Sequence, residues 1–444
     1  MAHTYTISDG TTTFSLVATN CAVVAPGYTP SVGDGKSPTV TESIPLMLYA
    51  ATASAMQTAI STLERLLEDA RRHAQRRTGL KVYLNVQLDS DASAWRSELV
   101  DARLELKENS LQVWAQAKME ATLYIERVPY FEGALAQIPL TNSSASSDTS
   151  GLTIYNHNDS GTGHDHYAGI LAADVAGNLP APIKFELTNT TGSSQTYYQL
   201  FVANNVFNDP VNFSGSGILE AETVIVSGYG SEASNADSSG GKYVTQTGDG
   251  DWEMRFEIAQ GIVADCAGYP FHILVRFRTQ PSGYCSASLM SATGAAILDR
   301  GDEINVGALY QDLADFGALY IPPGGYSANW AAHRLRLAFR TDGEATAEVD
   351  FIALFPAYAF REIKTHGISI ADGDTIVDDG VEGRAYMSVG GYDQPWLLAL
   401  GSPVYVWPGR IQRLYFLWSL ADHSAPIAQT FTVKAWYRPR RSTV

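Results

Sequence analysis

The sequence predicts a mainly β protein of several domains with one long helix. Turn-forming residues are frequent, apolar and polar residues alternate in many short runs, and only one segment has convincing helical periodicity. The 444 residues include 38 glycines and 19 prolines, and at roughly 150 residues per domain this length indicates two to four domains. Hydrophobic residues make up 45% and charged residues 17%, which disfavours both disorder and a coiled coil.

The helix is expected over residues 55–78. Ser54 with Gln57 three residues later forms a capping-box pattern, and Gly79 provides a C-terminal stop. Acidic residues precede a run of arginines, as the helix dipole favours. Apolar residues at steps of four and three draw a single stripe that must pack on a flat apolar surface. The stripe consists of Met56, Ile60, Leu63, Leu67, Ala70 and Ala74.

A very long β-hairpin is expected over residues 96–126. One face of its first arm carries Glu98, Val100, Ala102, Leu104 and Leu106, while the other carries mostly charge, and residues 112–126 of its second arm also alternate between apolar and polar. Strands usually have about five or six residues, so arms of this length generally reach beyond their own domain. The residues assigned to contacts between subunits are Arg96, Glu98, Val113, Trp114, Lys118 and Tyr124.

The remaining sequence divides at a polar linker and at one block with its own strand pattern. Residues 1–140 form the first domain and contain the helix and the hairpin. Residues 217–356 read as a self-contained inserted block. Residues 141–216, which begin with a linker of small polar residues, and residues 357–444 supply strands that close a second β domain around it.

Charge and motif content limit the function classes. The formal net charge of −17 argues against a grip on nucleic acid phosphates, although it suits a wall past which DNA slides. No apolar run reaches the roughly 20 residues of a membrane helix, and no secretion signal is expected. The three cysteines do not make a disulfide framework, which suits synthesis in a cytoplasm. Because no phosphate loop, zinc motif or nucleophile elbow occurs, we do not expect an enzyme.

Aromatic residues of the inserted block raise the question of glycan binding. Sugars stack their apolar ring faces on aromatic side chains while polar neighbours bind their hydroxyls. Residues 326–330 follow a Pro-Pro-Gly-Gly turn and read as an exposed loop. Its candidate glycan-binding residues are Tyr326, Asn329 and Trp330, although a core role for Trp330 is an equally good interpretation.

Residues 217–356 resemble the jelly-roll carbohydrate-binding modules with a galactose-binding-like fold. The matching segments are 220–222 (EAE), 240–244 (GGKYV), 267–269 (AGY), 272–278 (HILVRFR) and 349–352 (VDFI). In that family, the opening glutamates and the closing aspartate commonly hold a structural calcium ion. The resemblance therefore implies Glu220, Glu222 and Asp350 as calcium ligands, and oxygen-only ligation suits this metal. No other cofactor is expected.

The remainder of the chain resembles tail-tube and distal-tail proteins of long-tailed bacteriophages. Their tube fold is a β-sandwich or barrel with one flanking helix and a long hairpin, in the order found in residues 1–140. Near the C-terminus the resemblance rests on segments 378–383 (DDGVEG), 404–409 (VYVWPG), 410–416 (RIQRLYF) and 430–438 (TFTVKAWYR). Members carrying sugar-binding insertions are a known variation of this class.

The resemblances imply a structural protein of the virion tail, assembled in the host cytoplasm. Its partners would be further copies of itself in rings, other tail proteins and a host surface glycan, while DNA passes through the lumen without specific binding. The hairpin supports this independently, because rings can form when strands pair across subunits. The alternatives are a non-catalytic, lectin-like oligomeric protein and, less favoured, a glycan-processing enzyme.

Overall fold

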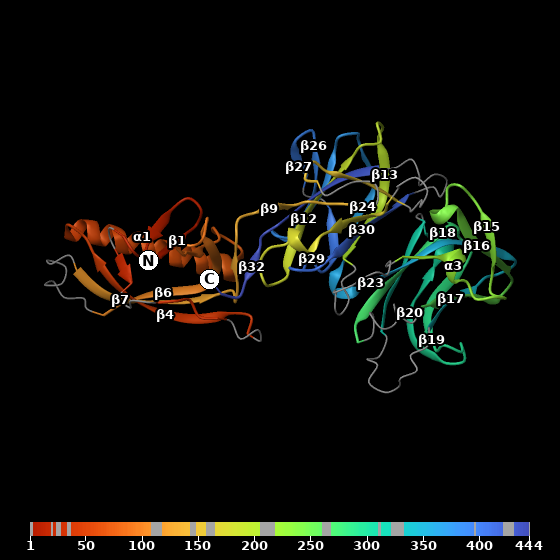
Figure 1. Cartoon of the computed structure of the whole chain (residues 1–444), viewed down its shortest axis with the longest axis horizontal. Helices are drawn as coiled ribbons and strands as arrows, with labels where there is room; N and C mark the ends of the chain where they lie inside the picture. The colour runs from red at the N-terminus through yellow and green to blue at the C-terminus, as the bar shows by residue number, and fades with distance from the viewer. Residues whose placement is uncertain are drawn as a thin grey trace. The chain divides into compact units, whose positions relative to one another are not determined.

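The computed structural model confirms a mainly β chain with one long helix (Figure 1). It describes residues 3–18, 21–23, 28–32, 37–107, 118–142, 148–156, 165–204, 218–259, 268–309, 312–320, 333–394, 397–420 and 430–443. The chain forms two compact units. Unit 1 comprises Met1–Ala136, Ala176–Leu179 and Arg438–Val444, and unit 2 comprises Gln137–Val175 and Pro180–Tyr437. No helix among the described residues is long and apolar enough to cross a membrane.

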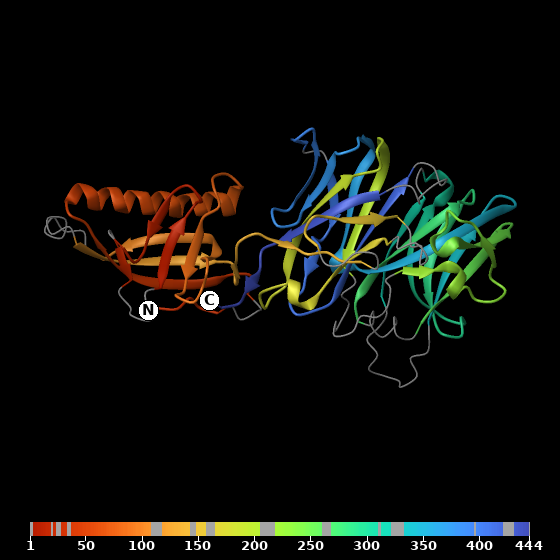
Figure 2. The same ribbon diagram turned by 45° about the horizontal axis from the view of Figure 1, so that its top comes forward.

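Unit 1 is a nine-stranded sheet with a helix along one face (Figure 2). The main path of the sheet is β2 (Thr13–Ser15), β1 (Thr4–Ser8), β5 (Tyr83–Gln87), β6 (Trp95–Leu106), β7 (Lys118–Arg127), β4 (Val40–Tyr49) and β3 (Cys21–Val23), and β8 (Phe131–Glu132) and β32 (Arg440–Arg441) pair beside it. The C-terminal strand β32 thus belongs to unit 1, where Arg440 and Glu132 form an ion pair at 2.7 Å.

The helix α1 (Ala53–Arg76) confirms the predicted element with shifted caps. Thr52, rather than Ser54, is the N-cap, and its side chain accepts a hydrogen bond from the Ala55 amide at 3.2 Å. Arg77, rather than a glycine, adopts the left-handed conformation that ends the helix. The stripe packs into the core of unit 1, where the helix buries Met56, Ala59, Ile60, Leu63, Leu66, Leu67 and Ala70.

One half of unit 2 is a β-sandwich of two antiparallel sheets. The eight-stranded sheet contains β10 (Leu152–Tyr155), β31 (Thr430–Tyr437), β12 (Ala181–Asn189), β25 (Thr375–Asp379), β26 (Arg384–Val389) and β27 (Tyr392–Gln394), with β9 (Ala136–Ile138) and β29 (Tyr405–Val406) at its side. The five-stranded sheet contains β11 (Tyr167–Ile170), β30 (Gln412–Leu420), β13 (Gln195–Asn204), β24 (Phe360–Ile370) and β28 (Leu398–Gly401). Aromatic pairs such as Phe185 with Phe416 join the two sheets.

The other half of unit 2 is a second sandwich, built from residues 218–356. Its six-stranded sheet contains β14 (Ile218–Glu220), β15 (Ser231–Ser234), β16 (Lys242–Gly248), β23 (Ala345–Pro356), β18 (Pro270–Thr279) and β21 (Leu313–Tyr320). The four-stranded sheet contains β17 (Asp251–Ile258), β22 (His333–Arg340), β19 (Tyr284–Met290) and β20 (Ile297–Asn305). The described part of unit 2 also contains the short helices α3 (Ala221–Val224), η1 (Ala172–Asp174), η3 (Ser239–Gly241), η4 (Val306–Ala308) and η5 (Ala357–Ala359).

The two halves of unit 2 share a hydrophobic core. Phe201, Phe360 and Tyr415 of the first sandwich pack with Leu274 and Phe355 of the inserted block. Burial of large aromatic side chains contributes much of the energy of such contacts. The inserted block is therefore fixed to its host sandwich, and we expect the two halves to unfold together.

Candidate functional site

The hairpin β6–β7 is part of the chain's own sheet. Strand β7 pairs along its whole length with β4, from Arg127 opposite Val40 to Lys118 opposite Tyr49. Strand β6 pairs with β7 between Leu99 and Leu106. The described parts of the two strands therefore form no arm separate from this sheet.

A β-bulge changes which face of β6 is buried. The register between β6 and β7 shifts between Leu99 and Asp101. Before the bulge, Trp95, Ser97 and Leu99 are buried; after it, Ala102 is buried while Asp101 is exposed. One extra residue moves the following side chains to the opposite face. The sequence alternation that placed Glu98 and Val100 on one face with Ala102 was therefore wrong across the bulge.

Beyond Leu99, one edge of β6 is open. Strand β5 pairs only with residues 95–98 of β6, and among the described strands none pairs with residues 100–106 on the edge away from β7. The Lys107 amide donates to the Glu120 carbonyl on β7 at 3.0 Å. Because backbone groups alternate between the two edges of a strand, those of Ala102, Leu104 and Leu106 point to the open edge.

The open edge borders a groove beside the helix. Glu64, Leu67, Glu68 and Arg71 of α1 and residues 102–104 of β6 line a cavity of about 280 Å³. The Ala102 amide is capped by the Asp101 carboxylate at 2.8 Å. This edge is partly protected by a charge but remains long enough to accept another strand.

The predicted hairpin residues lie on these strands where they are described. Glu98 on β6 lies within ion-pairing distance of Lys81, at 3.7 Å, and the guanidinium of Arg96 stacks 4.2 Å from the ring centre of Tyr83. Lys118 and Tyr124 lie on β7, where the Tyr124 ring stacks with Arg103. Val113 and Trp114 lie outside the described residues.

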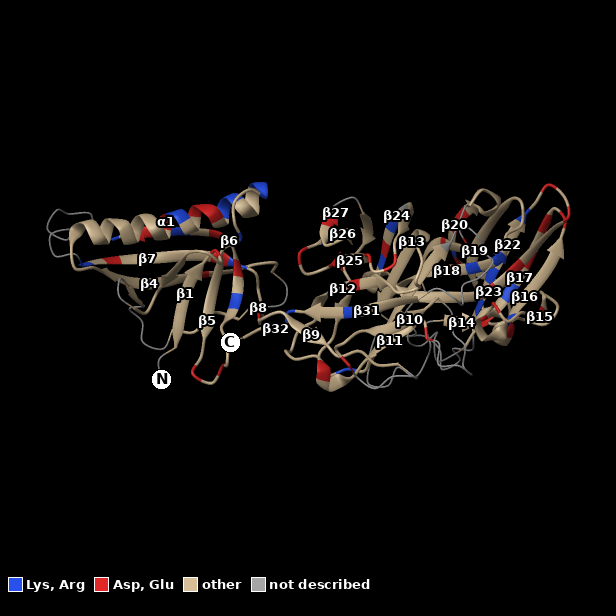
Figure 3. Ribbon diagram, turned by 90° about the horizontal axis from the view of Figure 1, so that it is seen from above, with Lys and Arg blue, Asp and Glu red and all other residues tan. Residues whose placement is uncertain are grey.

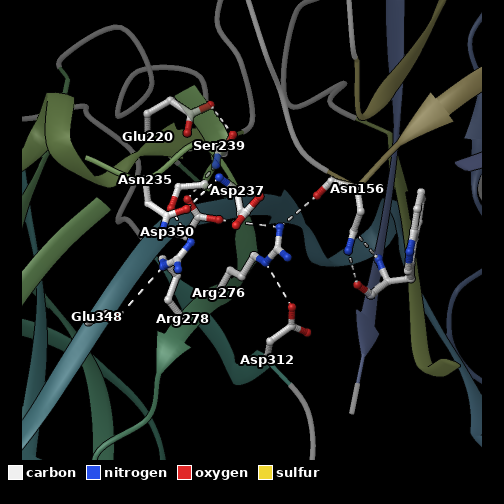
Figure 4. Close-up of polar contacts among 12 residues, drawn as sticks. Asn156, Glu220, Asn235, Asp237, Ser239, Arg276, Arg278, Asp312, Glu348 and Asp350 are labelled. Carbon is white, nitrogen blue, oxygen red and sulfur yellow. Dashed lines mark hydrogen bonds and ion pairs between the residues drawn. The ribbon is translucent and has the colours of Figure 1, made fainter. Parts of the chain in front are cut away.

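A cluster of buried carboxylates lies in the inserted block (Figure 4). Asp350 on β23 is 1% exposed and accepts a hydrogen bond from the Ser239 amide at 2.8 Å. Glu220, at the end of β14, accepts a hydrogen bond from the Ser239 hydroxyl at 2.9 Å. The turn containing Ser239 thus joins two of the three carboxylates that the resemblance to carbohydrate-binding modules implies as calcium ligands.

Both carboxylates are protonated more readily than usual. Burial, with the nearby charges of Asp350 and Glu222, raises the pKa of Glu220 to about 8. Burial likewise raises the pKa of Asp350 to about 7, against the lowering effects of Arg276 and the Ser239 amide. These carboxyls are therefore costly to ionise without a further cation.

Three carboxylate oxygens of this cluster, the kind of donor that calcium prefers, lack hydrogen-bond partners among the described residues. Glu220 Oε2, Glu222 Oε2 and Asp350 Oδ2 are buried and have no hydrogen-bond partner in the described part of the chain. A Cβ atom at Gly240 would lie 2.9 Å from the Glu222 carboxylate, so glycine leaves room beside the glutamates. However, no group of three or more acidic, histidine or cysteine side chains among the described residues has an arrangement able to hold a metal ion. Calcium takes about six to eight oxygen ligands, so further donors would be required.

Arg276 links the carboxylate cluster to the host sandwich. Its guanidinium donates to Asp312 at 3.1 Å and to the Asn156 carbonyl at 3.2 Å, and it lies 3.6 Å from Asp350. The side chain of Asn156 in turn bonds both backbone groups of Trp418. The sequence alone does not reveal this junction, because Asp312 and Asn156 lie 36 and 120 residues away from Arg276 along the chain.

The glycan-binding residues predicted from the sequence, Tyr326, Asn329 and Trp330, lie outside the described residues. The described surface of the inserted block carries a cavity of about 320 Å³ on its four-stranded sheet, beside Trp252. Trp252 is half-buried and stacks on Phe339 with ring centres 4.3 Å apart. Its indole therefore packs largely within the protein.

Comparisons with known proteins establish no family. No protein-family model and no curated protein match the sequence. Among solved structures, a family 35 carbohydrate-binding module from Clostridium thermocellum is similar to 31% of this chain over 97% of its own length, with 18% identity and a TM-score of 0.22. The activated, calcium-containing baseplate of phage P2 is similar over all of both chains, with 8% identity and a TM-score of 0.28. These scores are too low to establish a shared fold.

Proposed function

We propose that this chain is a structural subunit of a phage tail, a tail-tube or distal-tail protein that assembles into rings around the DNA channel. The open edge of β6 is the observation that carries this proposal. Its unpaired backbone groups can accept a strand from a second copy, and such main-chain pairing provides affinity without a deep pocket. The subunit has no catalytic role in this proposal, and it resides in the virion.

The charge of the exposed sheet face suits a DNA channel. On β6 and β7, the side chains opposite the core include five acidic residues (Glu98, Asp101, Glu105, Glu120 and Glu126) and three basic ones (Arg96, Arg103 and Lys118). Acidic and neutral side chains offer no counter-charge to phosphates, so DNA would not be retained. Three of the four arginines of α1, namely Arg71, Arg72 and Arg76, lie in the C-terminal part of the helix (Figure 3).

Ring assembly is tested by imaging the purified full-length chain in negative stain, with its mass measured by light scattering. We expect closed rings or stacked rings with a central channel. A monomer at high concentration would contradict the proposal. A compact oligomer without a channel would instead favour a lectin-like protein, particularly if glycan-array binding is lost in Trp330→Ala.

We further propose that calcium binds at Glu220, Glu222 and Asp350 and stabilises unit 2. Because the pKa values of Glu220 and Asp350 are raised, the stability of the calcium-free protein should fall as the pH rises. A carboxyl with a raised folded-state pKa stabilises the fold below its unfolded-state pKa, near 4, and this contribution is lost as the pH rises through about 7 to 8.

In chelator, we expect the melting temperature of unit 2 to fall by about 5 °C between pH 5 and pH 8.5. Calcium should restore most of this loss at pH 8.5 and little at pH 5. Scanning calorimetry measures both effects, and Glu220→Gln should weaken the calcium response. Because Asp378 also has a raised pKa, near 7, part of the pH slope will remain in this variant. Equal melting temperatures with calcium and with chelator at pH 8.5 would exclude the site.

A further inference from the structure

A second cavity lies at the open side of the host sandwich in unit 2. It has a volume of about 460 Å³, within the roughly 300–1,000 Å³ of small-molecule sites. It lies where β27 ends one sheet and β28 ends the other. Its lining comes from both sheets and includes Arg361, Arg384, Tyr386, Asp393, Leu397 and Ala399.

A buried arginine provides the first anchor of this cavity. Arg361 lies on β24 (Figure 3) and is 5% exposed. Its Nε lies 2.8 Å from Asp378 Oδ1. This is an ion pair without the directed geometry of a hydrogen bond, since neither atom has a hydrogen-bond partner among the described residues. A guanidinium has five N–H donors, so Asp378 leaves Arg361 with capacity for a second anion.

A second arginine lies at the same cavity. Arg384 on β26 is exposed, and its guanidinium lies 4.8 Å from the ring centre of Tyr386. In the described part of the chain, no carboxylate lies within ion-pairing distance of Arg384. The stacked ring restricts its movement, so it can meet an anion at lower entropic cost.

The rest of the lining fits a hydroxylated ring. Leu397 and the ring of Tyr386 are both 8% exposed and, with Ala385 and Ala399, form apolar walls. Asp393 is exposed at the cavity and can accept hydrogen bonds from hydroxyl groups. A ligand with a carboxylate, an apolar ring face and hydroxyl groups would use every part of this lining.

The cavity on the inserted block lacks this capacity. There Arg336 is paired with Glu253, and Arg340 lies 3.3 Å from Glu303. Both guanidinium groups already face carboxylates, so neither is a counterpart of Arg384. This cavity provides a matched control within the same chain.

We propose that the cavity at Arg361 and Arg384 binds a carboxylate-bearing sugar, such as a uronic acid unit of a glycan. Arg361 and Arg384 bind the carboxylate, Tyr386 and Leu397 contact the ring, and Asp393 accepts hydroxyl protons. This inference goes beyond the proposed tail function and assigns glycan binding to a site apart from residues 326–330. Ring assembly is measured separately, so failure of this site and failure of the proposed function are distinguishable.

Calorimetric titration of the full-length chain with sodium glucuronate tests the site, with glucose and sodium acetate as comparison ligands. We expect glucuronate to bind with a dissociation constant of about 1 mM or tighter and both comparison ligands to bind at least about tenfold more weakly. Equal binding of acetate would reduce the site to a simple anion site, and equal binding of glucose would remove the role of the arginines. Absence of glucuronate binding would overturn the proposal outright.

Variants locate the site. Arg361→Gln should weaken glucuronate binding about tenfold or more, and Arg384→Ala should weaken it severalfold. Ala399→Leu, which fills the cavity and leaves the Arg361–Asp378 pair intact, covers the case in which Arg361→Gln does not fold. The control Arg336→Ala should bind as the wild type does. Loss of binding in Arg336→Ala, or unchanged binding in the folded cavity variants, would assign the ligand elsewhere.

Discussion

Replacing Leu104 by proline is expected to abolish ring assembly while leaving unit 1 folded. The Leu104 amide points to the open edge of β6, so the substitution removes a donor that the isolated subunit does not use. If that edge pairs with a strand of the next copy, the contact between the two subunits loses a hydrogen bond, and the proline ring obstructs the incoming strand. Sedimentation velocity should show only monomer at concentrations where the wild type is fully assembled.

Leu104→Ala is the matched control for this prediction. It removes the same half-buried side chain but retains the amide, so its rings should persist with at most a modest loss of stability. Assembly of Leu104→Pro at wild-type concentrations would show that subunits meet at a different surface. A circular dichroism spectrum like that of the wild type is required of both variants.

Replacing Arg127 by methionine is expected to destabilise unit 1 by about 3–5 kcal/mol. Arg127 is 0% exposed, and it donates to Glu42 at 2.6 Å, to the Val128 carbonyl at 3.0 Å and to the Ser31 carbonyl at 2.5 Å. Without it, Glu42, which is only 6% exposed, becomes a buried charge without its cation. Urea unfolding followed by the fluorescence of Trp95 measures the loss.

The double variant Arg127→Met with Glu42→Met separates the charge effect from packing. Removing both ions should recover most of the lost stability, because the penalty comes from the unpaired carboxylate. If the double variant is as unstable as the single one, the network stabilises mainly through the Ser31 and Val128 carbonyls. Arg71→Met, at an exposed helix position, should change the unfolding free energy by less than about 1 kcal/mol.

Local sequence patterns predicted the presence of the helix and strands better than their exact ends and register. The apolar stripe from Met56 to Ala70 predicts a helix that packs on an apolar surface, and the structure contains this helix. The N-cap is Thr52 instead of the predicted Ser54. Serine and threonine are both good N-caps, so local sequence does not decide between them. The bulge after Leu99 was not predictable from alternation, because an inserted residue is visible only once its partner strand is known.

The candidate sites show the same limit. The resemblance to carbohydrate-binding modules predicted Glu220, Glu222 and Asp350 as calcium ligands, and the structure joins Glu220 to Asp350 through Ser239. It could not identify Arg276, whose partners Asp312 and Asn156 come from distant segments. The cavity at Arg361 was missed for the same reason, since its walls belong to two sheets that meet only after folding.

Hydrogen exchange across residues 100–107 tests the central claim most directly. The account predicts that the amides of Leu104 and Leu106 exchange rapidly in dilute monomer and become protected when the concentration is raised and rings form. Residues 118–127 of β7, already paired with β4, should be protected in both states. Assembled rings in which residues 100–107 exchange as fast as in the monomer would contradict the claim that β6 forms the seam between subunits.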